Sequence, residues 1–167
     1  SKTYCRWKPL VTLFLGTGCR VGEIIGLRWE DCDFENKTIS INHNTIYRKF
    51  EGESESRFHI TTPKTKAGIR TIPMLSDVKE ALLTEYNLQQ QIGFCDEMID
   101  GYSGFIFQNR FGSLLTSHDI NRALERIYTA CNEAERERAK EEKRPPVLIR
   151  HFSVHNLRHT FCTRFCE

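Results

Sequence analysis

Residues 16–29 read GTGCRVGEIIGLRW, a glycine turn set between two apolar segments. The segment before the turn predicts a buried helix that ends at Gly16-Thr17-Gly18, because glycine favours helix ends. The segment after the turn predicts a second helix, with Arg20 in its first turn. The apolar residues that support the two helices are Leu10, Val11, Leu13, Phe14, Leu15, Ile24, Ile25 and Leu27.

The rest of the chain predicts a small sheet followed by further helices. The β-branched residues of 38–48 predict a strand, and 57–74 predict a hairpin that turns between Pro63 and Gly68. The segment 104–107 predicts a short buried strand or extended piece. Three more helices are predicted: over 77–91 with Ser76 as N-cap, from Thr116 or Ser117 to Pro145-Pro146, and from His155 onward with Ser153 as cap. Without βαβ alternation, this order indicates an α+β, mainly helical fold.

Composition narrows the class of protein. The chain has 167 residues, 39% of them apolar and 28% charged, which is typical of one globular domain and not of a membrane or disordered protein. No apolar run is long enough to span a bilayer. Seven irregularly spaced cysteines favour reduced thiols used as small core residues. We therefore expect a cytoplasmic protein.

The distribution of charge indicates a polyanionic partner. The net charge is only +2, but 57–73 holds four basic residues and 143–166 holds five, with no acidic residue in either stretch. Segregated basic stretches on a near-neutral chain favour nucleic acid bound at one face. Candidates for contacts to the DNA backbone are Arg48, Lys49, Arg57, Lys66 and Arg70.

Three motifs could carry chemistry, and each also has a plain structural reading. Arg20 and Glu23 are either an exposed i, i+3 ion pair or a guanidinium beside the free N–H groups of a helix N-terminus, where a phosphate would bind. Lys64 and Lys66 either solubilise a hairpin tip or donate a proton to a leaving oxygen. His155 and Arg158 share one helix face, as polar surface residues or as phosphate ligands.

A zinc site is a further alternative on the last helix. Imidazoles and thiolates recur along one helical stripe there, and both are usual zinc ligands. The stripe consists of His155, His159, Cys162 and Cys166. One metal could take only neighbouring members, because a straight helix spreads the four over roughly 16 Å at about 1.5 Å per residue. Taken together, the three motifs instead favour phosphoryl transfer without metal or other cofactor, with arginines on the phosphate and lysine and histidine moving protons.

The chain resembles the tyrosine recombinases, the integrase family of phages and conjugative transposons. TGCRVGEIIGLRWEDCDF (17–34) is similar to their first conserved box, TPKTKAGIRTIP (62–73) to their β-hairpin, and HNLRHTFCT (155–163) to their second box. The match runs in order from about 11 to 166 and is most like integrases of Gram-positive mobile elements. It implies the catalytic-domain fold of these enzymes, with a small antiparallel sheet.

The resemblance also implies roles for individual residues. Arg20 and Arg158 would hold the scissile phosphate. Lys64, with Lys66 as its rival, would protonate the 5′ oxygen. His155 would assist proton transfer, Glu23 would orient Arg20 or its turn, and His159 would touch phosphate or brace the helix. The complete protein would cleave and rejoin double-stranded recombination sites through a 3′-phosphotyrosyl link, as a homo-tetramer on DNA and without a membrane partner.

The family's nucleophilic tyrosine is the point of departure. The tyrosines of this chain are Tyr4, Tyr47, Tyr86, Tyr102 and Tyr128, and all precede His155. We therefore expect residues 1–167 to be a catalytic-domain fragment that lacks the tyrosine segment and the upstream DNA-binding domain, and to be inactive alone. Rival interpretations are a type IB topoisomerase and a DNA-binding regulator without catalytic activity.

Overall fold

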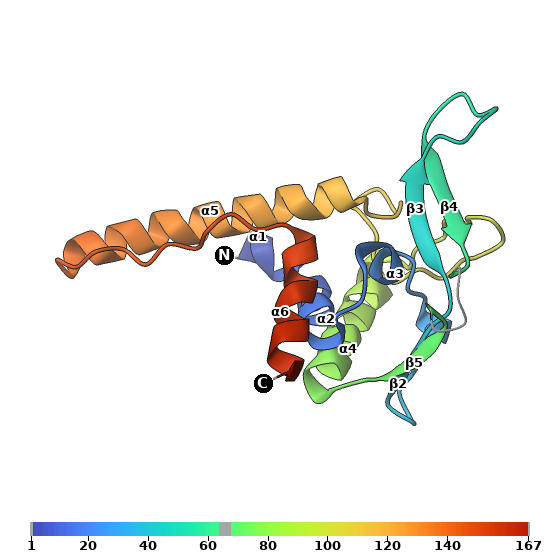
Figure 1. The fold of residues 1–167 in the computed structure, drawn as a ribbon, viewed down its shortest axis with the longest axis horizontal. Helices are drawn as coiled ribbons and strands as arrows, with labels where there is room; N and C mark the ends of the chain where they lie inside the picture. Colours follow the sequence, from blue (N-terminus) through green and yellow to red (C-terminus); the bar gives the residue numbers. More distant parts are fainter. Residues whose placement is uncertain (1, 64–67, 167) are drawn as a thin grey trace.

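The computed structural model describes residues 2–63 and 68–166 and has the expected mainly helical α+β fold with small antiparallel sheets. Helices α2, α4 and α6 occupy the middle of the molecule, and the two sheets lie to one side (Figure 1). The distal half of α5 projects away on the other side (Figure 1). No helix in the described ranges is both long and apolar enough to cross a membrane.

The helices on either side of the glycine turn form as predicted, with one difference in length. A short α1 (Lys2–Cys5) precedes α2 (Lys8–Thr17), which ends at Gly18. Helix α3 (Val21–Ile25) is shorter than predicted. The chain leaves the helix after Gly26 and forms a 3₁₀ turn at Trp29–Asp31, which is stabilised where the N–H and guanidinium of Arg28 donate to Asp31.

The single strand predicted over 38–48 is wrong, because the chain forms two strands that belong to different sheets. Strand β2 (Thr38–Ile41) lies between β1 (Cys32–Asp33) and β5 (Arg70–Pro73), whereas β3 (Asn44–Arg48) pairs with β4 (Arg57–Thr61). The break falls at Asn42-His43. The buried ring of His43 is fixed there, with Nδ1 against Asn42 Oδ1 and Nε2 2.6 Å from the carbonyl oxygen of Gly26.

The hairpin predicted over 57–74 is also wrong. Its two strands form, but β4 pairs with β3 from Thr61↔Asn44 to Arg57↔Arg48, and β5 pairs with β2 from Ile41↔Arg70 to Pro73↔Thr38. Each strand finds its partner upstream because β2 and β3 diverge at the break. The two strands of the predicted hairpin therefore belong to different sheets, and most of the turn predicted between Pro63 and Gly68 lies outside the described residues.

The later helices follow the prediction closely. They are α4 (Ser76–Ile92), α5 (Ser117–Glu141) and α6 (Val154–Cys166). Ser76 is the first residue of α4 and not its N-cap, which is Leu75. Thr116 caps α5, since its Oγ1 accepts the N–H of Asp119 (3.1 Å). Ser153 precedes α6 and donates its N–H to Asn156 Oδ1 (2.8 Å).

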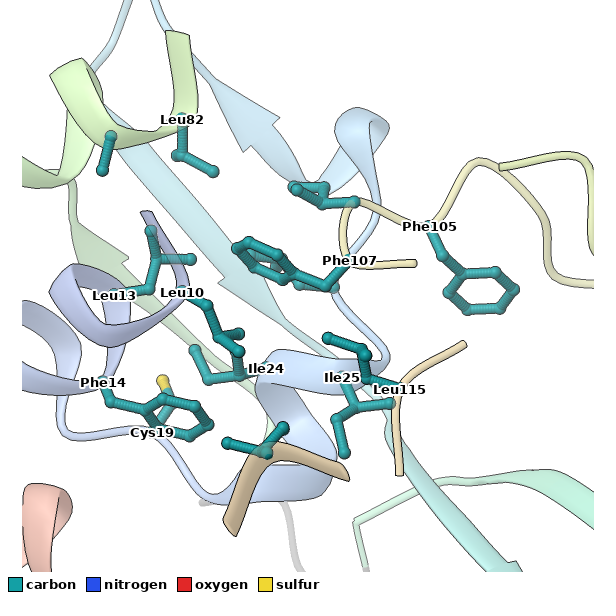
Figure 2. Packing of buried hydrophobic residues seen from close by; sticks show 14 of the residues in the cluster. Leu10, Leu13, Phe14, Cys19, Ile24, Ile25, Leu82, Phe105, Phe107 and Leu115 are labelled. Carbon is teal, nitrogen blue, oxygen red and sulfur yellow. The ribbon is translucent and has the colours of Figure 1, made fainter. Parts of the chain in front are cut away.

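One apolar core joins the helices to the extended segment at 105–107 and positions the glycine turn. The N–H of Ile106 donates to the carbonyl oxygen of Leu27 (2.9 Å), so this segment is bonded to the chain that follows α3. The buried thiol of Cys19 belongs to the same core. Figure 2 shows part of the cluster, with Leu10, Leu13, Phe14, Cys19, Ile24, Ile25, Leu82, Phe105, Phe107 and Leu115 labelled.

Candidate active site

The turn between α2 and α3 is shaped by Gly18. Its φ of +59° lies in the left-handed region that glycine adopts without strain, and its N–H donates to the carbonyl oxygen of Phe14 (3.2 Å). A Cβ at this position would lie 2.2 Å from the ring of Phe161. Helix α6 therefore packs directly on the turn, and this close approach requires a residue without a side chain.

The turn and α6 are also joined by a hydrogen bond. The guanidinium of Arg158 donates from Nη1 to the carbonyl oxygen of Gly18, across 140 residues of sequence. Arg158 is half-buried, and its helix packs against α2. The structure thus brings Arg158 to a carbonyl that lies two residues before Arg20.

Arg20 stands at the N-terminus of α3 and is held by Glu23. Its backbone N–H donates to Glu23 Oε2 (2.7 Å), and its Nη1 donates to Glu23 Oε1 (3.1 Å). The Arg20 side chain remains 61% exposed. Most of its guanidinium donors therefore face solvent, where they could bind an anion.

Glu23 is buried and accepts from a second arginine, Arg70 of β5. Nη1 and Nη2 of Arg70 donate to Oε1 and Oε2 at 3.0 and 2.9 Å, a bidentate pair. Burial raises the pKa of Glu23, but the hydrogen bonds from Arg70 and Arg20 outweigh burial and leave the pKa below its usual value. The carboxylate is therefore ionised between two guanidinium groups.

His155 and His159 lie one turn apart on α6. Both are exposed, and their rings meet edge to face with centroids 4.6 Å apart. Cys162 is exposed on the same helix. Within residues 2–63 and 68–166, no group of three or more histidine, cysteine or acidic side chains is arranged to hold a metal ion.

Lys64 and Lys66, the two candidates for the proton donor, lie outside the described residues. The residue that follows their segment is anchored near the arginines. Nη1 of Arg70 donates to the carbonyl oxygen of Gly68 (3.3 Å) as well as to Glu23.

The candidate DNA contacts divide into two groups. Arg48, Lys49 and Arg57 are exposed on the β3–β4 hairpin. Arg48 stacks over the ring of Phe50 at 4.0 Å, and Nε of Arg57 donates to Glu53 (2.5 Å), which raises the pKa of Arg57. Arg70 lies apart from them, with its guanidinium bound to Glu23. No local pattern indicates this pairing, because Arg70 stands 47 residues from its partner.

Comparison with known proteins points to one family. The model of the phage integrase family matches residues 1–167. The transposase from transposon Tn916 of Enterococcus faecalis is 32% identical over 170 residues, which cover 100% of this chain and 37% of that protein. A XerC-like tyrosine recombinase from Caldanaerobacter subterraneus is 29% identical, over 97% of this chain and 39% of its own length. The chain thus spans little more than a third of these relatives.

Solved structures agree in fold. The integrase of transposon Tn1549, in complex with circular intermediate DNA, superimposes with a TM-score of 0.79 at 31% identity. That match covers 99% of this chain and 48% of the solved one. The XerA recombinase, 18% identical, has the same fold with a TM-score of 0.57, over 99% of this chain and 45% of that one.

Proposed function

The chain belongs to the phage integrase family, and from this premise we propose that it forms the phosphate-binding part of a site-specific DNA recombinase. The observation that supports the proposal is the hydrogen bond from Arg158 of α6 to the carbonyl oxygen of Gly18, two residues before Arg20. Two guanidinium groups so placed can bind the non-bridging oxygens of one phosphodiester. In the transition state they stabilise the charge that develops on those oxygens.

Each remaining residue has a part in the same reaction. Lys64, or Lys66 in its place, protonates the 5′ oxygen as it leaves, and His155 assists this proton transfer. His159 lies edge to face against His155 and braces its ring or contacts phosphate. Tyrosine attack in the complete protein yields a 3′-phosphotyrosyl link and a free 5′ hydroxyl, without metal or cofactor. Four protomers on two double-stranded sites then exchange strands in the cytoplasm.

The nucleophile belongs, in this proposal, to another part of the complete protein. Within the described residues, the tyrosine rings contact residues other than Arg20 and Arg158. Tyr86 packs against Trp29, Tyr102 under Arg28, and Tyr128 against His151. The 167 residues alone should therefore bind DNA weakly and leave it uncut.

A suicide substrate tests the proposal in the full-length protein. A nick beside the scissile phosphate lets the short 5′ product diffuse away, so a covalent protein–DNA complex accumulates and is counted on a denaturing gel. Arg20→Ala should abolish the complex while much of the DNA binding remains, and a chelator should change nothing. Covalent complex formed by Arg20→Ala would refute the assignment. Binding without any complex from the wild-type protein would identify a regulator without catalytic activity.

A second substrate distinguishes the two lysines. Sulfur in place of the bridging 5′ oxygen is a good leaving group and needs no proton from an acid. Lys64→Ala should be slow on the normal substrate and recover on the sulfur substrate, whereas Lys66→Ala should respond little to the change. The opposite pattern would assign the proton donor to Lys66.

A further inference from the structure

We propose that Arg70 is a positioning residue for Arg20, acting through Glu23, and not a contact to DNA. The inference rests on the proposed function, since it concerns how the arginine clamp is kept ready for phosphate. It gives β5 a part in the site that the sequence does not signal.

The geometry commits Arg70 to Glu23. Both terminal nitrogens of its guanidinium bind the carboxylate, at 3.0 and 2.9 Å, and its side chain is 29% exposed against 61% for Arg20. Nη1 and Nη2 of Arg70 make four hydrogen bonds, to Glu23, Gly68 and Cys19, so few of its N–H donors are left to bind phosphate. Arg20 makes one side-chain hydrogen bond to Glu23, and its other donors face solvent.

The same guanidinium connects three parts of the fold. Besides Glu23 in α3, Arg70 donates to the carbonyl oxygen of Gly68 at 3.3 Å and to Sγ of Cys19 at 3.5 Å. Gly68 follows the segment that contains both candidate lysines, and Cys19 precedes Arg20. Arg70 therefore links Gly68 and α3 to the turn that bears Arg20.

The net charge of the three groups favours phosphate binding at Arg20. Glu23 with Arg20 alone would be a neutral pair, and the carboxylate would compete with phosphate for the guanidinium. Because Arg70 shares the same carboxylate, the three groups together keep one net positive charge. The guanidinium of Arg20 therefore presents a positive charge to solvent, and its hydrogen bond to Glu23 still orients the side chain.

The test measures cleavage and DNA binding separately in the full-length protein. Arg70→Gln should slow covalent complex formation at saturating DNA by roughly 10- to 100-fold, as loss of a residue that orients a ligand typically does. The slope of log K against log salt should not change, since no phosphate contact is lost. Arg70→Lys keeps the charge but not the fork, and should recover part of the rate.

A binding role would give the opposite result. If Arg70 contacts phosphate, Arg70→Gln should lower the salt slope by about one unit and leave the cleavage rate at saturation unchanged, and the proposal would be wrong. Arg57→Gln, at an exposed arginine of the β3–β4 hairpin, is the matched comparison: as a candidate contact to the DNA backbone, it should lower the salt slope by about one unit. A wild-type protein that forms no covalent complex would instead refute the proposed function itself.

A double variant guards against misfolding. Arg70→Gln leaves the buried Glu23 carboxylate short of a partner, whereas Glu23→Gln with Arg70→Gln removes both charges and should fold. If Arg70 acts through Glu23, the double variant should cleave no more slowly than the slower single variant. Multiplied rate losses would show that the two residues act independently and would overturn the proposal.

Discussion

The Glu23 cluster of the site has a near copy at the far end of α5, where Glu135 binds Arg144. In both, one glutamate takes both terminal nitrogens of an arginine: 3.0 and 2.9 Å at Glu23, 2.5 and 3.3 Å at Glu135. Each glutamate also accepts a backbone N–H, from Arg20 at 2.7 Å and from Val147 at 3.0 Å. The two clusters use the same hydrogen-bonding groups. Any difference in their effect on the protein therefore comes from their positions in the fold.

The two clusters differ in how far the glutamate is buried and in which part of the chain it holds. The Glu23 side chain is 4% exposed and lies where α2, α3 and β5 meet, whereas that of Glu135 is 17% exposed and holds the segment 142–150 against the projecting part of α5 (Figure 1). Asn132 assists there through two hydrogen bonds with the backbone of Ile149, at 2.9 and 2.8 Å. The same kind of ion pair thus holds the turn that bears Arg20 in one place and fastens an extended segment at the surface in the other.

The largest effect expected from this comparison is on global stability. Glu23→Gln leaves the partly buried Arg70 guanidinium without its counterion and should lower the free energy of unfolding by about 3 kcal/mol, the lower end of the range for broken buried pairs because Arg70 still meets water. Urea denaturation followed by circular dichroism measures the change.

Glu135→Gln is the matched control, with the same substitution in the same arrangement of donors. Its urea midpoint should move much less, because solvent screens the surface pair. If the urea midpoint moves equally in the two variants, burial does not determine how much each cluster stabilises the fold.

A smaller effect should come from the turn on which the Glu23 cluster depends. Gly18→Ala forces a side chain into a left-handed backbone and against the ring of Phe161, and should cost about 2 kcal/mol. Gly52→Ala carries the backbone strain alone, since its φ is +87° with nothing within 4 Å of the added carbon. Similar losses in thermal unfolding for both variants would mean that α6 is not packed on the turn as described.

The smallest effect concerns pH at the surface cluster. The Arg144 guanidinium and the Val147 N–H lower the pKa of Glu135 to about 2. A lowered carboxyl pKa stabilises the fold above the unfolded value, and that stabilisation is lost as pH falls toward the folded value. NMR titration should find Glu135 still ionised at about pH 3.5, where an ordinary glutamate is mostly protonated. Arg144→Gln should raise the midpoint toward 4.5, and a wild-type midpoint already there would exclude the pair in solution.

The helices were predictable from local patterns, whereas strand pairing was not. Thr116 and Gly18 mark helix ends through short-range chemistry, and the structure follows them. At the break in 38–48, the ring of His43 contacts the carbonyl oxygen of Gly26, 17 residues earlier. The alternation of residue types along 38–48 does not indicate such a contact. Without that break, 57–74 reads naturally as a hairpin.

The site shows the same division. Arg20, Glu23 and Arg158 stand in recognisable motifs, and the structure adds where they lie. Arg70 stands among the predicted contacts to the DNA backbone because its charge is visible in the sequence, whereas its partial burial is not. Only the register between β2 and β5, with Arg70 opposite Ile41, places it beside Glu23.

The hydrogen bond from Arg158 to Gly18 also constrains the order of events while the chain is being synthesised. Its partners are 140 residues apart, and at a synthesis rate of about 5–20 residues per second Arg158 leaves the ribosome's catalytic centre roughly 7–28 s after Gly18. Throughout that interval the nascent chain carries Arg20 without its companion. The hydrogen bond that holds Arg158 at the glycine turn therefore cannot form until the residues between Gly18 and Arg158 have been synthesised.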